Sequence, residues 1–387
     1  MRRRLRAKRQ LYPDDQVEER RHRNDLNAAP SASAQPQPLA PARWNWREVK
    51  RVLVVRLRSI GDAVLATPSL LALRRFLPEA EIDVLLEDWV APVLEGFREV
   101  DRVIAVERSN WARARLIGTL RAARYDVAFN LHGGTTATFL TKASNARHRV
   151  GFASYQYARL HNHLAPPPAQ IWQQPNTHSV EQQLALLGWT GVPVSDRPRT
   201  RLAVTTHADE KTKRRLLAEG LDDAQPFVLM HPAAAFESKT WPAERFARVA
   251  DHLRARGLRT VVVAAPDEAE IAREVAARAH GRIIQFTDLS LPELIALAHR
   301  AHIFIGNDSG VAHIAAAVRT PVVVIFGSSN VAHWRPWTDL PHAVVRAEMA
   351  CAPCAGYECT AFQRPQCIRH VSVEDVMTAV DRLLANR

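Results

Sequence analysis

The sequence predicts an α/β protein made of two similar halves, each an open parallel sheet with helices. From Val49 onward, short β-branched runs alternate with longer segments of helical periodicity. This pattern lapses near the middle of the chain and starts again at Pro226. Apolar strands that are joined by helices indicate parallel sheets. Because such sheets bind ligands at the carboxyl ends of their strands, we expect the two carboxyl edges to face a cleft.

The apolar runs and the helical periodicity give the order of elements in the first half. The strands expected there are 51–57, 81–86, 101–106 and 125–131, and the helices are 62–76, 89–97, 111–123 and 178–189. Three consecutive prolines, Pro166 to Pro168, argue against regular helix just before the last of these.

The second half repeats the pattern. Its expected strands are 226–232, 259–265, 282–286, 302–306 and 320–327, and its helices are 242–256, 267–280, 291–300 and 309–318. A last helix begins with a capping box formed by Ser372 and Asp375.

Composition divides the chain into four regions. Residues 1–46 are expected to be a disordered tail, basic at first and then rich in Ala and Pro. The first domain is assigned to 47–195, a linker to 196–225, and the second domain with the terminal helix to 226–387. The tail either contacts an anionic membrane surface or is simply solvated.

The net charge of +12 favours anionic partners. The sequence lacks zinc-finger spacing and an aromatic RNA-binding signature, so nucleic acid is not an expected partner. It also lacks a secretory signal and an apolar run long enough to span a membrane, which indicates a cytoplasmic location.

The most informative stretch is "IGNDSGVAHIAAAVRTPVVVIFG" (305–327), where a strand leads into a helix. Ser309 and Gly310 suit a helix N-terminus, which attracts anions. His313 lies one turn further along the same side. These features fit a phosphate site that includes Asp308, or alternatively a capped helix on which His313 simply packs.

Two other loops of the second half end strands of the same predicted sheet. Lys239 precedes a helix and is placed either to pair with a phosphate or to be solvated. Glu268 and Glu270 begin the next helix, where one of them either accepts bonds from ribose hydroxyls or only caps. Because no Walker A or G-x-G-x-x-G motif occurs, this half reads as a nucleotide-binding domain of another kind.

In the first half, two turns follow predicted strands. "RSIGDAVLATP" contains a single glycine, Gly61, followed by Asp62. "NLHGGTTATF" (130–139) offers Gly133 and Thr135 to acceptor hydroxyls or phosphates, or else forms a plain strand–helix turn.

Three stretches give the chain a family resemblance over about residues 50–385. "RVLVVRLRSIGDAVLATPSLLALRRFLPEAEIDVL", "HPAAAFESKTWP" and "NDSGVAHIAAAVRTPVVVIFGSSNVAHWRPW" occur in the order of glycosyltransferase family 9, the ADP-heptose:lipopolysaccharide heptosyltransferases. The resemblance implies two Rossmann-like domains facing a cleft, the GT-B fold. It also implies an inverting, metal-independent transfer, without a required cofactor, from an ADP-heptose donor to a lipid-linked lipid A–inner-core acceptor at the inner membrane.

The resemblance also assigns roles to individual residues. It places the catalytic acid on Asp62, where a carboxylate can take the proton of an acceptor hydroxyl. The donor-binding residues that it implies are Lys239, Glu268, Asp308, Ser309, Gly310 and His313. The acceptor-binding residues are then expected in the other half, namely Gly61, His132, Gly133 and Thr135.

Two departures leave the sugar nucleotide open, because the loops at 233–235 and 264–266 carry alanine where the family often has glycine or hydroxyl residues. A sugar-nucleotide epimerase and a non-catalytic saccharide- or nucleotide-binding protein are the competing hypotheses.

Four cysteines cluster near the C-terminus, namely Cys351, Cys354, Cys359 and Cys367. Their compact spacing is compatible with a structural zinc site, although the last two spacings differ from usual zinc knuckles. Free or redox-active thiols are the alternative that a reducing cytosol favours.

Overall fold

The computed structural model describes residues 35–107, 110–354 and 358–385 and confirms the α/β class. Its first sheet contains β1 (Arg51–Val55), β2 (Glu81–Glu87), β3 (Arg102–Val106), β4 (Val127–Asn130), β5 (His148–Phe152) and β6 (His163–Ala165). Its second sheet contains β7 (Phe227–His231), β8 (Arg259–Val263), β9 (Ile284–Phe286), β10 (Ile303–Asn307), β11 (Val322–Phe326) and β12 (His342–Arg346).

The two sheets have the same strand order. The first runs β3-β2-β1-β4-β5-β6 and the second β12-β11-β10-β7-β8-β9, with every pairing parallel. Each predicted strand is present, with ends that move by one or two residues. The sequence pattern missed β5, β6 and β12, which are short or partly exposed and carry little β-branched periodicity.

The helices of the first half differ more from the prediction. The expected helix 62–76 is two helices, α2 (Ile60–Val64) and α3 (Thr67–Phe76), because Pro68 at the start of α3 cannot continue a preceding helix. Residues 89–97 form only a 3₁₀ turn, η2 (Ala91–Leu94). The remaining helices are α4 (Asn110–Ala122), α5 (Thr135–Ala143), α6 (Pro168–Trp172) and α7 (Ser179–Trp189).

The triple proline does not exclude a helix, because α6 begins at Pro168 itself. Proline is favoured in the first helical turn, where its missing N–H would have no helical partner. The prolines therefore determine where this helix begins.

Most predicted helices of the second half are present. They are α9 (Ala243–Ala255), α10 (Ala269–Arg278), α11 (Leu291–Arg300), α12 (Gly310–Ala317) and α15 (Val373–Ala385). The predicted cap of α15 is confirmed, since Ser372 Oγ accepts from Asp375 N at 3.0 Å. Further helices are α8 (Thr206–Ala218), which lies in the expected linker and packs on α11, and the short α13 (Val331–Trp334) and α14 (Gln366–Arg369).

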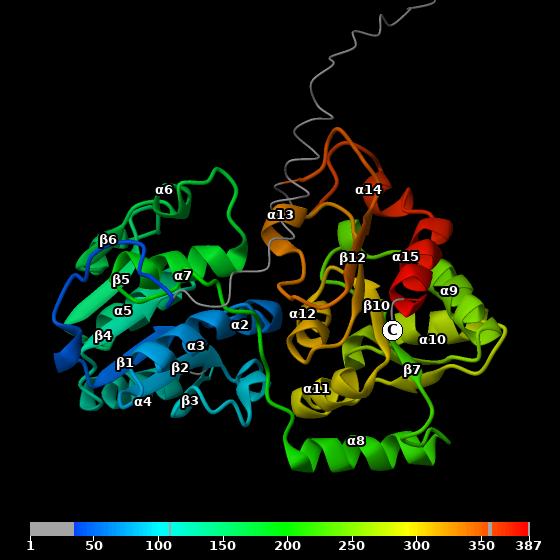
Figure 1. Cartoon of the computed structure of the whole chain (residues 1–387), viewed down its shortest axis with the longest axis horizontal. Coiled ribbons are helices and arrows are strands. Elements are labelled where there is room, and N and C mark those ends of the chain that lie inside the picture. Colours follow the sequence, from blue (N-terminus) through cyan, green and yellow to red (C-terminus); the bar gives the residue numbers. More distant parts are fainter. Residues whose placement is uncertain (1–34, 108–109, 355–357, 386–387) are drawn as a thin grey trace, which may run out of the picture. The chain divides into compact units, whose positions relative to one another are not determined.

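Burial explains why the strands read as apolar runs. Helices flank both faces of each sheet (Figure 1), so residues 52–55 of β1 and 303–307 of β10 are almost completely buried. Among the described residues, no helix is both long and apolar enough to cross a membrane.

Residues 37–46, expected within the tail, pack against the first half. Leu39 N and Ala40 N donate to Gly188 O, each at 3.1 Å. The indole of Trp46 is buried and donates to Thr190 O at 2.9 Å. The basic start of the chain, 1–34, lies outside the described residues.

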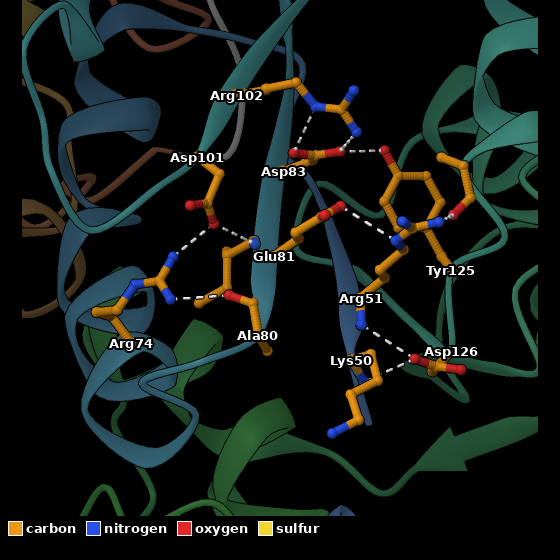
Figure 2. Close-up of polar contacts among 12 residues, drawn as sticks. Lys50, Arg51, Arg74, Ala80, Glu81, Asp83, Asp101, Arg102, Tyr125 and Asp126 are labelled. Atoms are coloured by element: carbon orange, nitrogen blue, oxygen red, sulfur yellow. Dashed lines mark hydrogen bonds and ion pairs between the residues drawn. The ribbon is translucent and has the colours of Figure 1, made fainter. Parts of the chain in front are cut away.

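A polar network, which we call the amino-edge network, lies where the strands of the first sheet begin (Figure 2). Asp83 is fully buried and accepts from Arg102 Nη2 at 2.6 Å and from Tyr125 Oη at 2.5 Å. Burial, with the bond to Asp83, raises the pKa of Tyr125. Asp101 accepts from Ile82 N at 2.7 Å, and Asp126 accepts from Lys50 N at 2.8 Å. Each carboxylate of this network thus has protein partners.

Candidate functional site

The turn after β1 places Asp62 at the carboxyl edge of the first sheet. Ser59 N donates to Asp62 Oδ2 at 2.9 Å, so the carboxylate caps α2 as a capping box requires. Its other oxygen, Oδ1, accepts from Arg56 Nη2. Asp62 is still about one-fifth exposed, since its side chain retains 21% of its accessible surface. Capping therefore does not remove the carboxylate from a possible reactant.

Arg56 connects Asp62 to His132, which follows β4. Its side chain is only 9% exposed, and its Nη1 lies 3.2 Å from His132 Nδ1. Burial, together with the Arg56 charge, lowers the pKa of His132 to about 4. The ring is therefore neutral near pH 7, and its Nδ1 accepts from Arg56. The Nε atom of Arg56 has no hydrogen-bond partner among the described residues.

A cavity of about 290 Å³ opens beside Arg56 and His132. It is lined by Arg56, Leu131, His132, Phe152, Ser154, Tyr155, Pro168, Ser179, Gln182, Gln183, His333 and Trp334. Gln183 is buried and its Oε1 is unpaired among the described residues. The lining is mostly polar, uncharged groups around one buried guanidinium, which suits a hydroxyl-rich ligand. We call this the Arg56 cavity.

The other predicted acceptor residues shape this region indirectly. Gly133 has φ +79°, and a Cβ there would lie 2.5 Å from the ring of Tyr155. Asn130 Oδ1 holds the turn by accepting from Gly133 N at 2.9 Å. Thr135 Oγ1 donates to Gln156 Oε1 at 2.7 Å. Of the four predicted residues, only His132 lines the Arg56 cavity itself.

In the second half, Lys239 and Asp308 meet across the loops after β7 and β10. Lys239 ends the 3₁₀ turn η4 (Glu237–Lys239), and its Nζ lies 2.9 Å from Asp308 Oδ2. Ser329 Oγ donates to the same oxygen at 2.5 Å. Asp308 is buried, whereas the Lys239 side chain is 23% exposed. The ammonium is thus oriented by a buried carboxylate but remains accessible.

A second pair lies beside them. His231 Nδ1 is 3.2 Å from Ser309 Oγ, and His231 Nε2 is 3.8 Å from Glu268 Oε2. The proximity of His231 lowers the pKa of Glu268, which keeps this group ionised. Glu268 also accepts from Ala265 N at 3.2 Å, so the expected capping role is real. The Glu268 carboxylate therefore caps the start of the helix and also lies at the edge of the candidate site.

The N-terminus of α12 meets α2 of the other half. A Cβ on Gly310 would lie 3.1 Å from Gly61 N, and one on Gly61 would lie 3.0 Å from His313 Cδ2. A Cβ at either position would force its neighbour to give by a few tenths of an ångström, so glycine suits both. His313 is buried here, which lowers its pKa, and its Nδ1 lacks a hydrogen-bond partner among the described residues. Packing therefore places the α2 turn directly against the Gly310 turn.

The sequence pattern missed several residues of the Arg56 cavity. Arg56 directly follows an apolar strand, a position at which a functional side chain is expected in a parallel sheet. Tyr155, Gln183 and His333 have no comparable local signal, because they come from three different segments.

The four cysteines line a small pocket together with Ser328 and with Ser238, the residue that precedes Lys239. All four are free thiols, and burial raises the pKa of Cys354 and Cys367. Within the described part of the chain, no group of three or more His, Cys, Asp or Glu is arranged to hold a metal ion. The zinc hypothesis gains no support from this geometry.

Comparisons with known proteins agree with this architecture. The model of "Glycosyltransferase family 9 (heptosyltransferase)" matches residues 113–363. Lipopolysaccharide heptosyltransferase 3 of Escherichia coli is 30% identical over 351 residues, which are 85% of this chain and 97% of the relative.

Two solved structures share the fold. Glycosyltransferase family 9 from Veillonella parvula superposes with a TM-score of 0.74 at 22% identity, over 87% of this chain and 98% of that one. Escherichia coli ADP-heptose lps heptosyltransferase II gives 0.72 at 22% identity, over 87% and 99%. The family match over residues 113–363 and the relative that is 30% identical over most of the chain lead to one conclusion: this chain is a glycosyltransferase and belongs to glycosyltransferase family 9.

Proposed function

We propose that this enzyme transfers heptose from ADP-heptose to a lipid-linked saccharide of lipopolysaccharide, with inversion at the anomeric carbon and without a required metal. The names of its relatives support the donor and the acceptor class. The single observation that carries the proposal is the Gly61–Gly310 contact. It brings the Asp62 turn, the Arg56 cavity and the Lys239–Asp308 pair into one region.

In this proposal Asp62 is the general base. Its Oδ2 accepts from both Ser59 N and Ser59 Oγ, whereas Oδ1 accepts only from Arg56 and so has a second lone pair for an acceptor hydroxyl. Arg56 fixes the orientation of the carboxylate. The hydroxyl then attacks the anomeric carbon as its proton passes to Asp62, and the bond from that carbon to the diphosphate breaks.

We assign to residues of the second half the stabilisation of the negative charge that develops on the leaving diphosphate. Lys239 is held by Asp308 and would exchange part of this pairing for a phosphate oxygen, while Ser329 continues to donate to Asp308. The free N–H groups at the start of α12, near Ser309 and Gly310, add fixed positive dipoles. These groups supply the charge that a divalent cation would otherwise provide.

Glu268 is proposed to accept from the ribose hydroxyls. Ala265 N orients the carboxylate, and the nearby His231 favours its ionised, accepting form. His313 is proposed to approach the donor from α12, through the ring nitrogen that now lacks a partner.

The Arg56 cavity is proposed to take the acceptor sugar. Neutral His132, Gln183 and Ser154 offer both donors and acceptors, as hydroxyl recognition requires. Gly61 allows the acceptor turn to approach α12, while Gly133 and Thr135 act through Tyr155 and Gln156. The reaction is then expected at the cytoplasmic face of the inner membrane.

The test uses purified full-length protein with ADP-heptose, with and without a lipid A–inner-core acceptor. ADP release that depends on the acceptor, together with glycosylated acceptor seen by mass spectrometry, is the expected result. Isomerised donor without acceptor would instead indicate an epimerase. Donor binding without turnover would indicate a binding protein.

A further inference from the structure

Three of the six large apolar side chains that are exposed in the described chain lie close together in sequence: Phe139, Tyr157 and Leu164. Phe139 on α5 is 51% exposed and Tyr157 is 53% exposed. Their rings are 5.5 Å apart, so they form one apolar surface rather than two isolated side chains. Adjacent exposed aromatic residues of this kind commonly mark an interaction surface.

This surface is built onto the Arg56 cavity. Tyr157 stands at φ +58° just after Ser154 and Tyr155, which line the cavity. Gln156 joins this loop to α5, because its side-chain carbonyl accepts from Thr135 Oγ1 at 2.7 Å and its backbone carbonyl from Thr138 Oγ1 at 3.4 Å. The aromatic pair is thus held in place beside the proposed acceptor site.

The chain segment that carries the pair is basic and lacks acids. From Val127 to Val180 the sequence contains Lys142 and three arginines but no Asp or Glu. Lys142 lies one turn from Phe139 on α5 and is exposed, as is Arg159, two residues after Tyr157. Exposed Arg121 on α4 donates to Ala143 O at the end of α5. The ion pairs found among the described residues include none of these three cations.

We propose that Phe139 and Tyr157, with Arg121, Lys142 and Arg159, form the surface by which this enzyme docks on an anionic membrane. Aromatic rings settle at the membrane interface, and basic side chains are attracted to anionic headgroups. The complementary charge favours a lipid surface over a second copy of this basic chain. The inference rests on the proposed function, because a lipid-linked acceptor must reach the Arg56 cavity from a membrane.

The binding test compares full-length protein with its variants by co-sedimentation. One set of vesicles contains phosphatidylethanolamine and phosphatidylglycerol, and the other contains phosphatidylcholine alone. Wild type should partition onto the anionic vesicles at low salt and less at high salt. F139S/Y157S and R121Q/K142Q/R159Q should each lower this partitioning by about tenfold or more. The matched control is Phe362→Ser, which removes an aromatic ring of similar exposure, 45%, from the second half.

The proposal is overturned if the wild type does not bind the anionic vesicles or if the variants bind as the wild type does. It is also overturned if Phe362→Ser weakens binding as much as F139S/Y157S does. It is also overturned if the wild type is a dimer in solution that F139S/Y157S dissociates, since the surface would then serve a second copy.

A second readout separates this surface from the proposed chemistry. F139S/Y157S should lose transfer to an acceptor in vesicles but retain transfer to a delipidated acceptor in solution. Equal loss on both acceptors would place the two residues in the acceptor site and contradict docking. If neither the wild type nor any variant transfers heptose, the proposed function is wrong. Vesicle binding then still tests whether Phe139 and Tyr157 belong to a membrane-docking surface.

Discussion

The two edges of the first sheet use charged residues in opposite ways. At the amino edge, Asp83, Asp101 and Asp126 are each bonded to protein donors, and none of them faces the Arg56 cavity. At the carboxyl edge, Arg56 and Gln183 are buried with atoms that lack partners among the described residues. A buried polar atom without a partner is costly, and the cost is tolerated where a ligand can supply the missing bond. The difference separates residues that hold the fold together from those that we assign to substrate.

The largest effect is expected at Asp62. Asp62→Asn retains a capping side chain but cannot take a proton, so transfer should fall by about 10²–10⁴-fold while ADP-heptose affinity is kept. Acceptor-dependent ADP release and a donor titration measure the two quantities. The amino-edge control is Asp126→Asn, whose rate per folded molecule should be unchanged. Normal transfer by Asp62→Asn would reduce Asp62 to a helix cap.

The next largest effect is expected at Lys239, the cation that we propose to stabilise the leaving diphosphate. Lys239→Ala removes the ammonium and should lower kcat by about 10²–10³-fold. A matched control is Lys213→Ala, which breaks an exposed ion pair with Asp223 far from the carboxyl edge. Single-turnover kinetics report the chemical step. Equal rates for the two variants would contradict the role given to Lys239.

At the amino edge the expected loss is in stability rather than rate. Asp83→Asn removes the charge that Arg102 and Tyr125 share, so the free energy of unfolding should fall by about 2 kcal/mol. Glu81→Gln breaks only an exposed pair with Arg51 and should cost less than about 1 kcal/mol. Urea unfolding measures both. If Asp83→Asn lowered the transfer rate per folded molecule, the amino edge would also contribute to catalysis. That result would contradict the purely structural role given to it.

The Gly61–Gly310 contact predicts a smaller effect on rate. Gly310→Ala places a Cβ 3.1 Å from Gly61 N and must shift α2 against α12, so we expect transfer to slow by about tenfold. Gly118→Ala on α4 is the control, because a Cβ there meets no atom within 4 Å. If both alanine variants transfer equally well, the contact does not position Asp62.

The smallest effect is a dependence of stability on pH. The pKa of His132 lies at about 4 in the folded protein, below its ordinary value of 6.5. Above about pH 6.5 the ring is neutral in both states; as pH falls towards 4, only the unfolded chain gains the proton, so stability decreases. His132→Asn should lose less stability than wild type over this window. Urea unfolding at several pH values measures it, and parallel curves would contradict the assignment.

Local sequence was sufficient for the fold class, and it supplied candidate residues for the site. Strand and helix periods identified most elements, and the turns after β1, β7 and β10 pointed to Asp62, Lys239 and Asp308, because a parallel sheet carries its ligands at those ends. The short strands β5, β6 and β12 were missed, since short and partly exposed strands carry little apolar pattern. The proline run was misjudged because its effect depends on which proline begins the helix.

The sequence by itself determined that two parallel sheets form and which residues follow their strands, because apolar period and turn chemistry act over a few neighbours. Only the tertiary structure decided the partners: Lys239 with Asp308, 69 residues away, and Gly61 against Gly310. It also gathered Arg56, Tyr155, Gln183 and His333 around one cavity. Such groupings depend on how whole helices and sheets pack, and no local pattern records which distant segments will meet.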